Sequence, residues 1–70
     1  MKSFTEEHFA NRLAVYRERC LTDLKEFMDT GYSQLLSSAV HYYAVYRELG
    51  LSFMMPFDSW NNIYEEAKKK

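Results

Sequence analysis

The middle of the chain carries the broadest hydrophobic face in the sequence. On a helical wheel of roughly 100° per residue, the apolar side chains of residues 35–49 cover an arc of about 220°. The remaining polar arc holds Gln34, Ser37, Ser38, His41 and Glu48, with Val45 among them. A surface helix needs an apolar stripe of only about 100° or slightly more. This segment therefore predicts a helix that packs against two neighbours in the middle of a small bundle.

The preceding segment has a regular helical period. Its apolar residues recur at steps of 4, 3, 4, 4 and 3, at Phe9, Leu13, Tyr16, Cys20, Leu24 and Phe27. The average step of about 3.6 is that of a straight helix, whereas a repeat of 3.5 would indicate a supercoil. Ser3 and Glu6 match a capping box at its start, and Gly31 offers a left-handed residue at its end. The pattern predicts a globular-bundle helix over residues 4–29.

Glycine and proline mark the remaining boundaries, since the chain has only 2 glycines and 1 proline. The central helix is expected to begin at Tyr32 or Ser33 and to end before Gly50, over residues 33–49. Pro56 is expected as the first residue of a third helix over residues 56–68. The apolar face of this third helix would consist of Phe57, Trp60, Ile63, Tyr64 and Ala67.

These elements predict an all-α fold with one domain over residues 1–70, a small three-helix bundle. The first two helices form an antiparallel hairpin because only a few residues separate them, and the C-terminal helix closes it. If the first helix breaks near Thr22, where Thr22 or Asp23 could cap a new helix, the bundle has four helices. The unbroken apolar phase favours one helix. The predicted core consists of Phe9, Leu13, Tyr16, Cys20, Leu24, Phe27, Leu36, Val40, Tyr43, Trp60 and Tyr64.

Charge and cysteine content exclude several classes of protein. Nine Lys and Arg oppose 10 Asp and Glu, for a net charge of −1, which argues against a strongly basic nucleic-acid-binding domain. The single cysteine cannot form an internal disulfide and fits a reducing compartment. No secretory signal pattern and no apolar run near the ~20 residues of a membrane span are present. The expectation is a cytoplasmic protein with no membrane contact.

Candidate catalytic and metal-binding residues all have simpler structural interpretations. Cys20 lies at the centre of the first apolar stripe, so burial should make it an inert thiol with a raised pKa. His41 neighbours Ser37 and Ser38, but an orienting acid and an oxyanion site are missing, which favours a solvated histidine. The two histidines and the scattered carboxylates do not show a metal-ligand spacing such as H-E-x-x-H. The sequence therefore predicts no enzyme activity, no catalytic residue, no metal and no cofactor.

Aromatic and methionine side chains crowd into the second half of the chain. They are Tyr42, Tyr43, Tyr46, Phe53, Met54, Met55, Phe57, Trp60 and Tyr64. One interpretation places them all in the core between the second and third helices. The alternative is an interaction surface, because residues 53–55 form an apolar triplet in a connector, where polar residues are usual. The partner-binding residues predicted on this basis are Tyr42, Tyr46, Phe53, Met54, Met55 and Phe57.

Basic residues suggest a second kind of surface. Arg12, Arg19 and Asp23 flank Tyr16 on one edge of the first helix and could contact phosphate, as could the lysines at 68–70. A solvated, salt-bridged face and a lysine-capped helix end are the simpler interpretations.

Three short patterns resemble the Hha/YmoA family of small helical nucleoid-associated modulators. They are Arg19-Cys20, Ser38-Ala39, and Pro56 followed four residues later by Trp60. The resemblance implies an adaptor that binds a larger DNA-organising protein and reads little DNA directly. It covers less than half of the chain, and the interval between the first two patterns is several residues shorter than in that family.

The function predicted from the residues is a small non-catalytic protein-interaction module: an adaptor, inhibitor or regulator of a larger protein. The expected length of the first helix, nearly 40 Å against about 25 Å for the second, leaves an overhang for the connector, the third helix or another chain to cover. A two-fold homodimer is therefore a second expected form of association. The alternative function is an accessory regulator of transcription or nucleic-acid handling, with nucleic acid not expected as a direct specific ligand.

Overall fold

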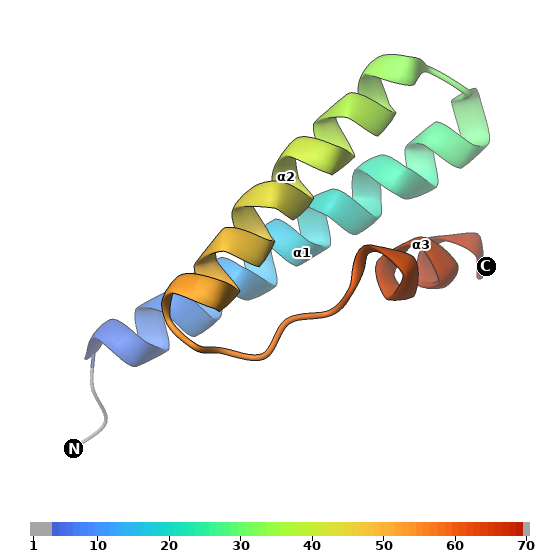
Figure 1. Ribbon diagram of the computed structural model, residues 1–70. Coiled ribbons are helices and arrows are strands. Elements are labelled where there is room, and N and C mark those ends of the chain that lie inside the picture. The colour runs from blue at the N-terminus through green and yellow to red at the C-terminus, as the bar shows by residue number, and fades with distance from the viewer. Residues whose placement is uncertain (1–3, 70) are drawn as a thin grey trace.

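Three helices form the fold. The computed structural model describes residues 4–69, with the side chains of residues 7–69. Helix α1 spans Phe4–Thr30, α2 spans Ser33–Ser52 and α3 spans Trp60–Lys68 (Figure 1). No strand occurs between residues 4 and 69. The all-α, three-helix prediction is confirmed, and α1 runs unbroken past Thr22. The predicted capping box of Ser3 and Glu6 lies outside the described side chains.

A two-residue turn joins α1 and α2 into the predicted antiparallel hairpin (Figure 1). Gly31 has a φ of 79°, and its N–H donates to the carbonyl of Phe27 at 2.7 Å. This is the left-handed helix end that glycine adopts without strain. The predicted role of Gly31 is therefore confirmed.

The second glycine has a different role from the one predicted. Helix α2 continues through Gly50 to Ser52. Gly50 is buried, and a Cβ built there would lie 3.0 Å from Cγ of Phe57 and 3.2 Å from the carbonyl oxygen of Met55. The N–H of Met55 donates to the carbonyl of Gly50 at 2.9 Å. The glycine thus permits close approach of the following segment, and the prediction that it ends the helix is wrong.

The start of the third helix also differs from the prediction. Residues 55–59 have no helical structure, and α3 begins at Trp60 rather than Pro56. Ser59 is the N-cap, and its hydroxyl accepts from the N–H of Asn62 at 3.2 Å. The carboxylate of Asp58, expected in the first helical turn, instead binds Arg17 of α1. A serine cap therefore overrides the proline signal.

Two tyrosines of α2 hold the connector, residues 53–59, against the hairpin. The hydroxyl of Tyr43 donates to the carbonyl of Asp58 at 3.2 Å, and the N–H of Asp58 donates to the hydroxyl of Tyr46 at 2.7 Å. The ring of Tyr43 meets Trp60 edge-on at 5.5 Å, and the ring of Tyr46 meets Phe57 edge-on at 6.1 Å. These contacts direct the chain back along the hairpin, so that α3 lies beside α1 (Figure 1).

The core forms around α1, which contacts both α2 and α3. Its buried members are Leu13, Cys20, Leu21, Leu24, Ala39, Tyr46, Ile63 and Ala67. Five further residues of the predicted core are half-buried against it: Tyr16, Leu36, Tyr43, Trp60 and Tyr64. Phe9 and Phe27 are half-buried.

Two predictions about α2 are wrong. Helix α1, rather than α2, occupies the middle of the bundle. Val40, predicted in the core, is 50% exposed, because α3 packs against α1 and leaves this side of α2 uncovered.

The length difference between the hairpin helices is accommodated within the chain. Helix α1 has 27 residues and α2 has 20, or about 40 Å and 30 Å at ~1.5 Å per residue. Phe9, in the early turns of α1, stacks on Phe53 of the connector with ring centroids 3.8 Å apart. The connector and α3 therefore cover the longer helix, and the overhang does not by itself require a second chain.

An ion-pair network ties α1 to the C-terminal part of the chain. The guanidinium of Arg17 binds Asp58 through Nε and Glu66 through Nη2, each at 2.7 Å. The hydrogen bond from Arg17, together with its charge, holds the pKa of Glu66 below its usual value. The same two carboxylates raise the pKa of Arg17. The network thus joins α3 and the connector to α1.

Acid should loosen α3 through this network. Because the pKa of Glu66 is lowered in the folded protein, the stabilisation is present above the ordinary carboxylate pKa of about 4.3 and is lost as the pH falls through the lowered value. Arg17→Gln should lower the free energy of unfolding at neutral pH and reduce its dependence on acid. Fluorescence of Trp60, the single tryptophan, followed from pH 7 to pH 3, checks both. Equal acid sensitivity in the two proteins would contradict the assignment.

Candidate functional site

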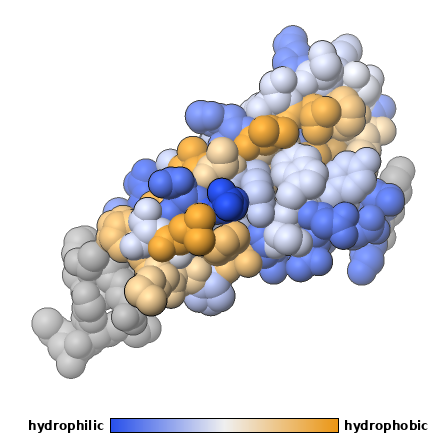
Figure 2. Space-filling view, in the orientation of Figure 1, coloured by the Kyte–Doolittle hydropathy of each residue, from blue (hydrophilic) through white to orange (hydrophobic). Residues whose placement is uncertain are grey.

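Exposed apolar side chains gather where α2 passes into the connector. Leu51 is 52% exposed, Phe53 45% and Met54 93%. The N–H of Met54 donates to the carbonyl of Leu51 at 3.4 Å, and Phe53 stacks on Phe9. Figure 2 shows hydrophobic side chains at this end of the molecule and along α2. We call Phe9, Leu51, Phe53 and Met54 the connector surface.

The backbone at Met54 is strained. Its φ is 53°, the left-handed region that a side chain with a Cβ rarely adopts. This conformation costs on the order of 1 kcal/mol relative to a residue in an ordinary region. Since its side chain is 93% exposed, Met54 gains almost no stabilisation from packing in the core. Stability of the isolated chain therefore gives no reason for methionine at position 54.

The structure separates the other predicted site residues from this surface. Tyr46 is 4% exposed and belongs to the core, where its hydroxyl and ring hold the connector. Met55 and Phe57 are half-buried against the core, and Tyr42 lies half-buried elsewhere on the hairpin. Phe53 and Met54 are the predicted residues that meet at one exposed place.

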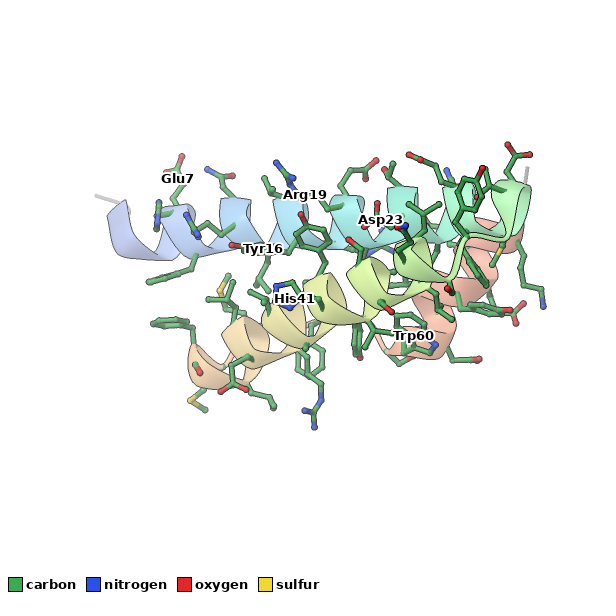
Figure 3. The ribbon with its side chains drawn as sticks, turned by 90° about the horizontal axis from the view of Figure 1, so that it is seen from above. Glu7, Tyr16, Arg19, Asp23, His41 and Trp60 are labelled. Carbon is green, nitrogen blue, oxygen red and sulfur yellow. The ribbon has the colours of Figure 1, made fainter. Side chains whose placement is uncertain are left out.

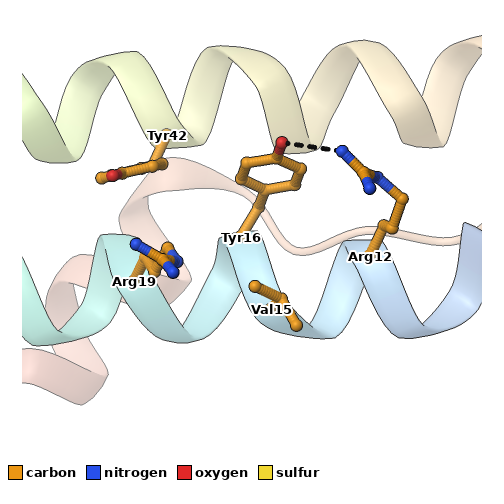
Figure 4. A pocket seen from close by; sticks show the side chains of 5 residues that line it. All are labelled: Arg12, Val15, Tyr16, Arg19 and Tyr42. Atoms are coloured by element: carbon orange, nitrogen blue, oxygen red, sulfur yellow. Dashed lines mark hydrogen bonds between the residues drawn. The ribbon is translucent and has the colours of Figure 1, made fainter.

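A groove runs between α1 and α2 on the side of the hairpin away from α3. Arg12, Val15, Tyr16 and Arg19 of α1 and Tyr42 of α2 line it, and it encloses about 330 Å³ (Figure 4). Figure 3 shows this seam from above, with Tyr16 and Arg19 labelled on α1 and α3 behind the hairpin. Val15 is 50% exposed and contributes an apolar edge.

The two arginines of the groove are held against tyrosine rings. The Nη2 of Arg12 donates to the hydroxyl of Tyr16 at 3.2 Å, and its Cζ lies 5.7 Å from the centre of that ring. The Cζ of Arg19 lies 5.8 Å from the ring centre of Tyr42. The two rings are 6.1 Å apart. These cation–π contacts orient the guanidinium groups at the groove.

Neither Arg12 nor Arg19 forms an ion pair with a carboxylate among the described residues. The expected salt-bridged face is therefore not found at these two arginines. Asp23, the nearby acid, instead accepts a hydrogen bond from the hydroxyl of Ser38 at 2.6 Å. Sequence periodicity placed Arg12, Tyr16 and Arg19 on one edge, but it gave no signal that Tyr42 completes the groove.

Groups that could support catalysis are dispersed. Cys20 is completely buried, and this burial raises the pKa of its thiol to about 11. His41 is exposed with its ring edge-on to Tyr42, and the hydroxyl of Ser38 is engaged by Asp23. Within the described residues, no group of three or more His, Cys, Asp or Glu could hold a metal ion. None of the helices described is both long and apolar enough to span a membrane.

The fold and these surfaces define an all-α protein of three helices. A scan with protein-family models, a search of curated proteins and a search of solved structures each find no match. The likeness to the Hha/YmoA family is thus limited to the three short patterns in the sequence.

Proposed function

We propose that this chain is a small non-catalytic protein-interaction module that binds a larger protein through the connector surface. It acts as an adaptor, inhibitor or regulator of that protein. The observation that supports the proposal is Met54, an apolar side chain that is 93% exposed on a backbone with a φ of 53°. In this proposal, a contact outside the chain compensates for the strain and the exposure of this residue.

The shape of the connector surface favours a concave apolar pocket on a larger protein over a second copy of the chain. Methionine is flexible and polarisable, so it adapts well as a protruding anchor. Four grooves lined by described residues each contain at least one charged side chain: Arg12 and Arg19, Glu18 and Asp23, Glu48, and Glu26. A methionine of a second copy that entered any of these four grooves would therefore lie beside a charged side chain. The same proposal locates the module in the cytoplasm, supported by its free buried thiol.

Met54→Gly tests the proposal because it removes the side chain and relieves the strain together. The free energy of unfolding should rise by about 0.5–1 kcal/mol, while the affinity for the partner should fall about tenfold or more. A photo-crosslinking amino acid at position 54 identifies the partner in the native host, and titration of the purified proteins measures the affinity. Opposite effects on stability and binding exclude misfolding as the cause.

Met28→Ala is the matched control, since Met28 is 36% exposed on α1. It should change the affinity by less than about twofold. Unchanged binding by Met54→Gly would refute the proposal. A solution mass of twice 8.4 kDa that Met54→Gly returns to one chain would also refute it, because the occupant would then be a second copy.

A further inference from the structure

We infer that the groove of Arg12, Val15, Tyr16, Arg19 and Tyr42 binds carboxylate side chains of an acidic protein segment. This site is separate from the connector surface, and its occupation does not depend on the proposed role of Met54. The inference rests on two guanidinium groups that tyrosine rings orient and that no carboxylate of the described chain neutralises.

Arg17 provides an internal comparison. All three arginines lie on the same helix within three turns, but Arg17 forms two ion pairs at 2.7 Å on the side that α3 covers. Arg12 and Arg19 lie on the uncovered seam, where the Nη2 of Arg12 donates one hydrogen bond to the hydroxyl of Tyr16. A guanidinium has five N–H donors in a plane, and a ring on one face leaves the edge donors available for a carboxylate. The groove thus presents guanidinium donors that can bind an anion.

The spacing of the arginines indicates the form of the ligand. Arg12 and Arg19 are separated by seven residues, which is about 10 Å along the helix axis at ~1.5 Å per residue. Two carboxylates seven residues apart on a second helix, lying along the groove, have the same separation. Arginine binds a carboxylate through two parallel hydrogen bonds, which makes the match geometrically specific. Val15, 50% exposed, would contact the apolar side of such a helix.

The surrounding charges favour a protein segment over a nucleic-acid backbone. Glu18 and Asp23 line the adjoining groove together with Arg19 and Tyr42. A continuous polyanion that follows the seam beyond Arg19 would meet these carboxylates, whereas a segment with two separate acids ends at the arginines. The net charge of −1 points the same way.

A designed peptide provides the probe: an alanine-based helix with two glutamates seven residues apart, and the same peptide with glutamines. The glutamate peptide should shift the side-chain Nε–H NMR signals of Arg12 and Arg19, and the glutamine peptide should not. The double variant Arg12→Gln, Arg19→Gln should weaken binding about tenfold or more. Arg47→Gln, at an exposed arginine of α2, should change it by less than about twofold.

Several outcomes would overturn the inference. They are the absence of a shift at Arg12 and Arg19 at millimolar glutamate peptide, equal binding of the glutamine peptide, and an Arg47→Gln effect as large as that of the double variant. Tighter binding of a DNA duplex than of the glutamate peptide at the same salt concentration would assign the groove to phosphate instead. Melting curves of the variants establish that each remains folded. Since none of these measurements involves Met54, failure here leaves the proposal for the connector surface standing.

Discussion

Leu24→Ala is expected to lower the free energy of unfolding by about 2–5 kcal/mol, the range for removing a large buried side chain without full collapse of the cavity. Leu24 is 0% exposed and lies in α1, which contacts both other helices. A chain of 70 residues has a total stability of roughly 4–10 kcal/mol at ~0.05–0.15 kcal/mol per residue. The variant should therefore be largely unfolded at modest denaturant concentration. Urea unfolding followed by circular dichroism measures the change.

Val40→Ala is the matched control for this experiment. Val40 is 50% exposed on the outer face of α2, so its truncation should change the stability by no more than about 0.5 kcal/mol. A loss as large as that of Leu24→Ala would show that this face is covered in solution. The comparison thus tests the finding that α1, rather than α2, is the middle helix.

Gly50→Ala is expected to destabilise the protein by about 1–3 kcal/mol, the usual penalty for overpacking. Helix propensity alone predicts the opposite, since alanine in a helix interior is favoured over glycine by about 1 kcal/mol. The new Cβ would collide with the ring of Phe57 and approach the carbonyl of Met55 to 3.2 Å. Thermal or urea unfolding gives the sign directly.

A double variant identifies the source of the clash. Phe57→Ala removes the Cγ and Cδ1 atoms that meet the new methyl group, so Gly50→Ala should cost less in the Phe57→Ala background than in the wild type. The two substitutions should therefore be non-additive by more than about 0.5 kcal/mol. Strict additivity, or stabilisation by Gly50→Ala alone, would contradict the close approach of α2 and the connector.

The hairpin was predictable because its signals are local. The repeated steps of three and four residues in α1 and the left-handed Gly31 depend on the chain within a few turns. Gly50 and Pro56 show the limit of such signals. A glycine can end a helix or admit a neighbouring ring, and only the packed position of Phe57 distinguishes these roles. Ser59 caps α3, so the helix begins at Trp60 rather than at Pro56.

The candidate surfaces were predictable only where their signals are local in the sequence. Exposure of Phe53 and Met54 follows from an apolar triplet in a connector, which has few core positions to fill. Tyr46 has the same composition signal, but its burial depends on the path of the connector around its hydroxyl. The arginine groove needs Tyr42 from α2 beside Tyr16 from α1. The register between two helices determines that pairing, and single-helix periodicity does not contain it.

The buried thiol of Cys20 also makes the chain a reporter of its own motion. Cys20 is the single cysteine of the sequence, and its side chain on α1 is completely buried in the core. A reagent in solution reaches its sulfur only when the helices separate, so the rate of alkylation counts these openings in the unaltered protein. A ligand that clamps the hairpin would slow that reaction, whichever surface it occupies.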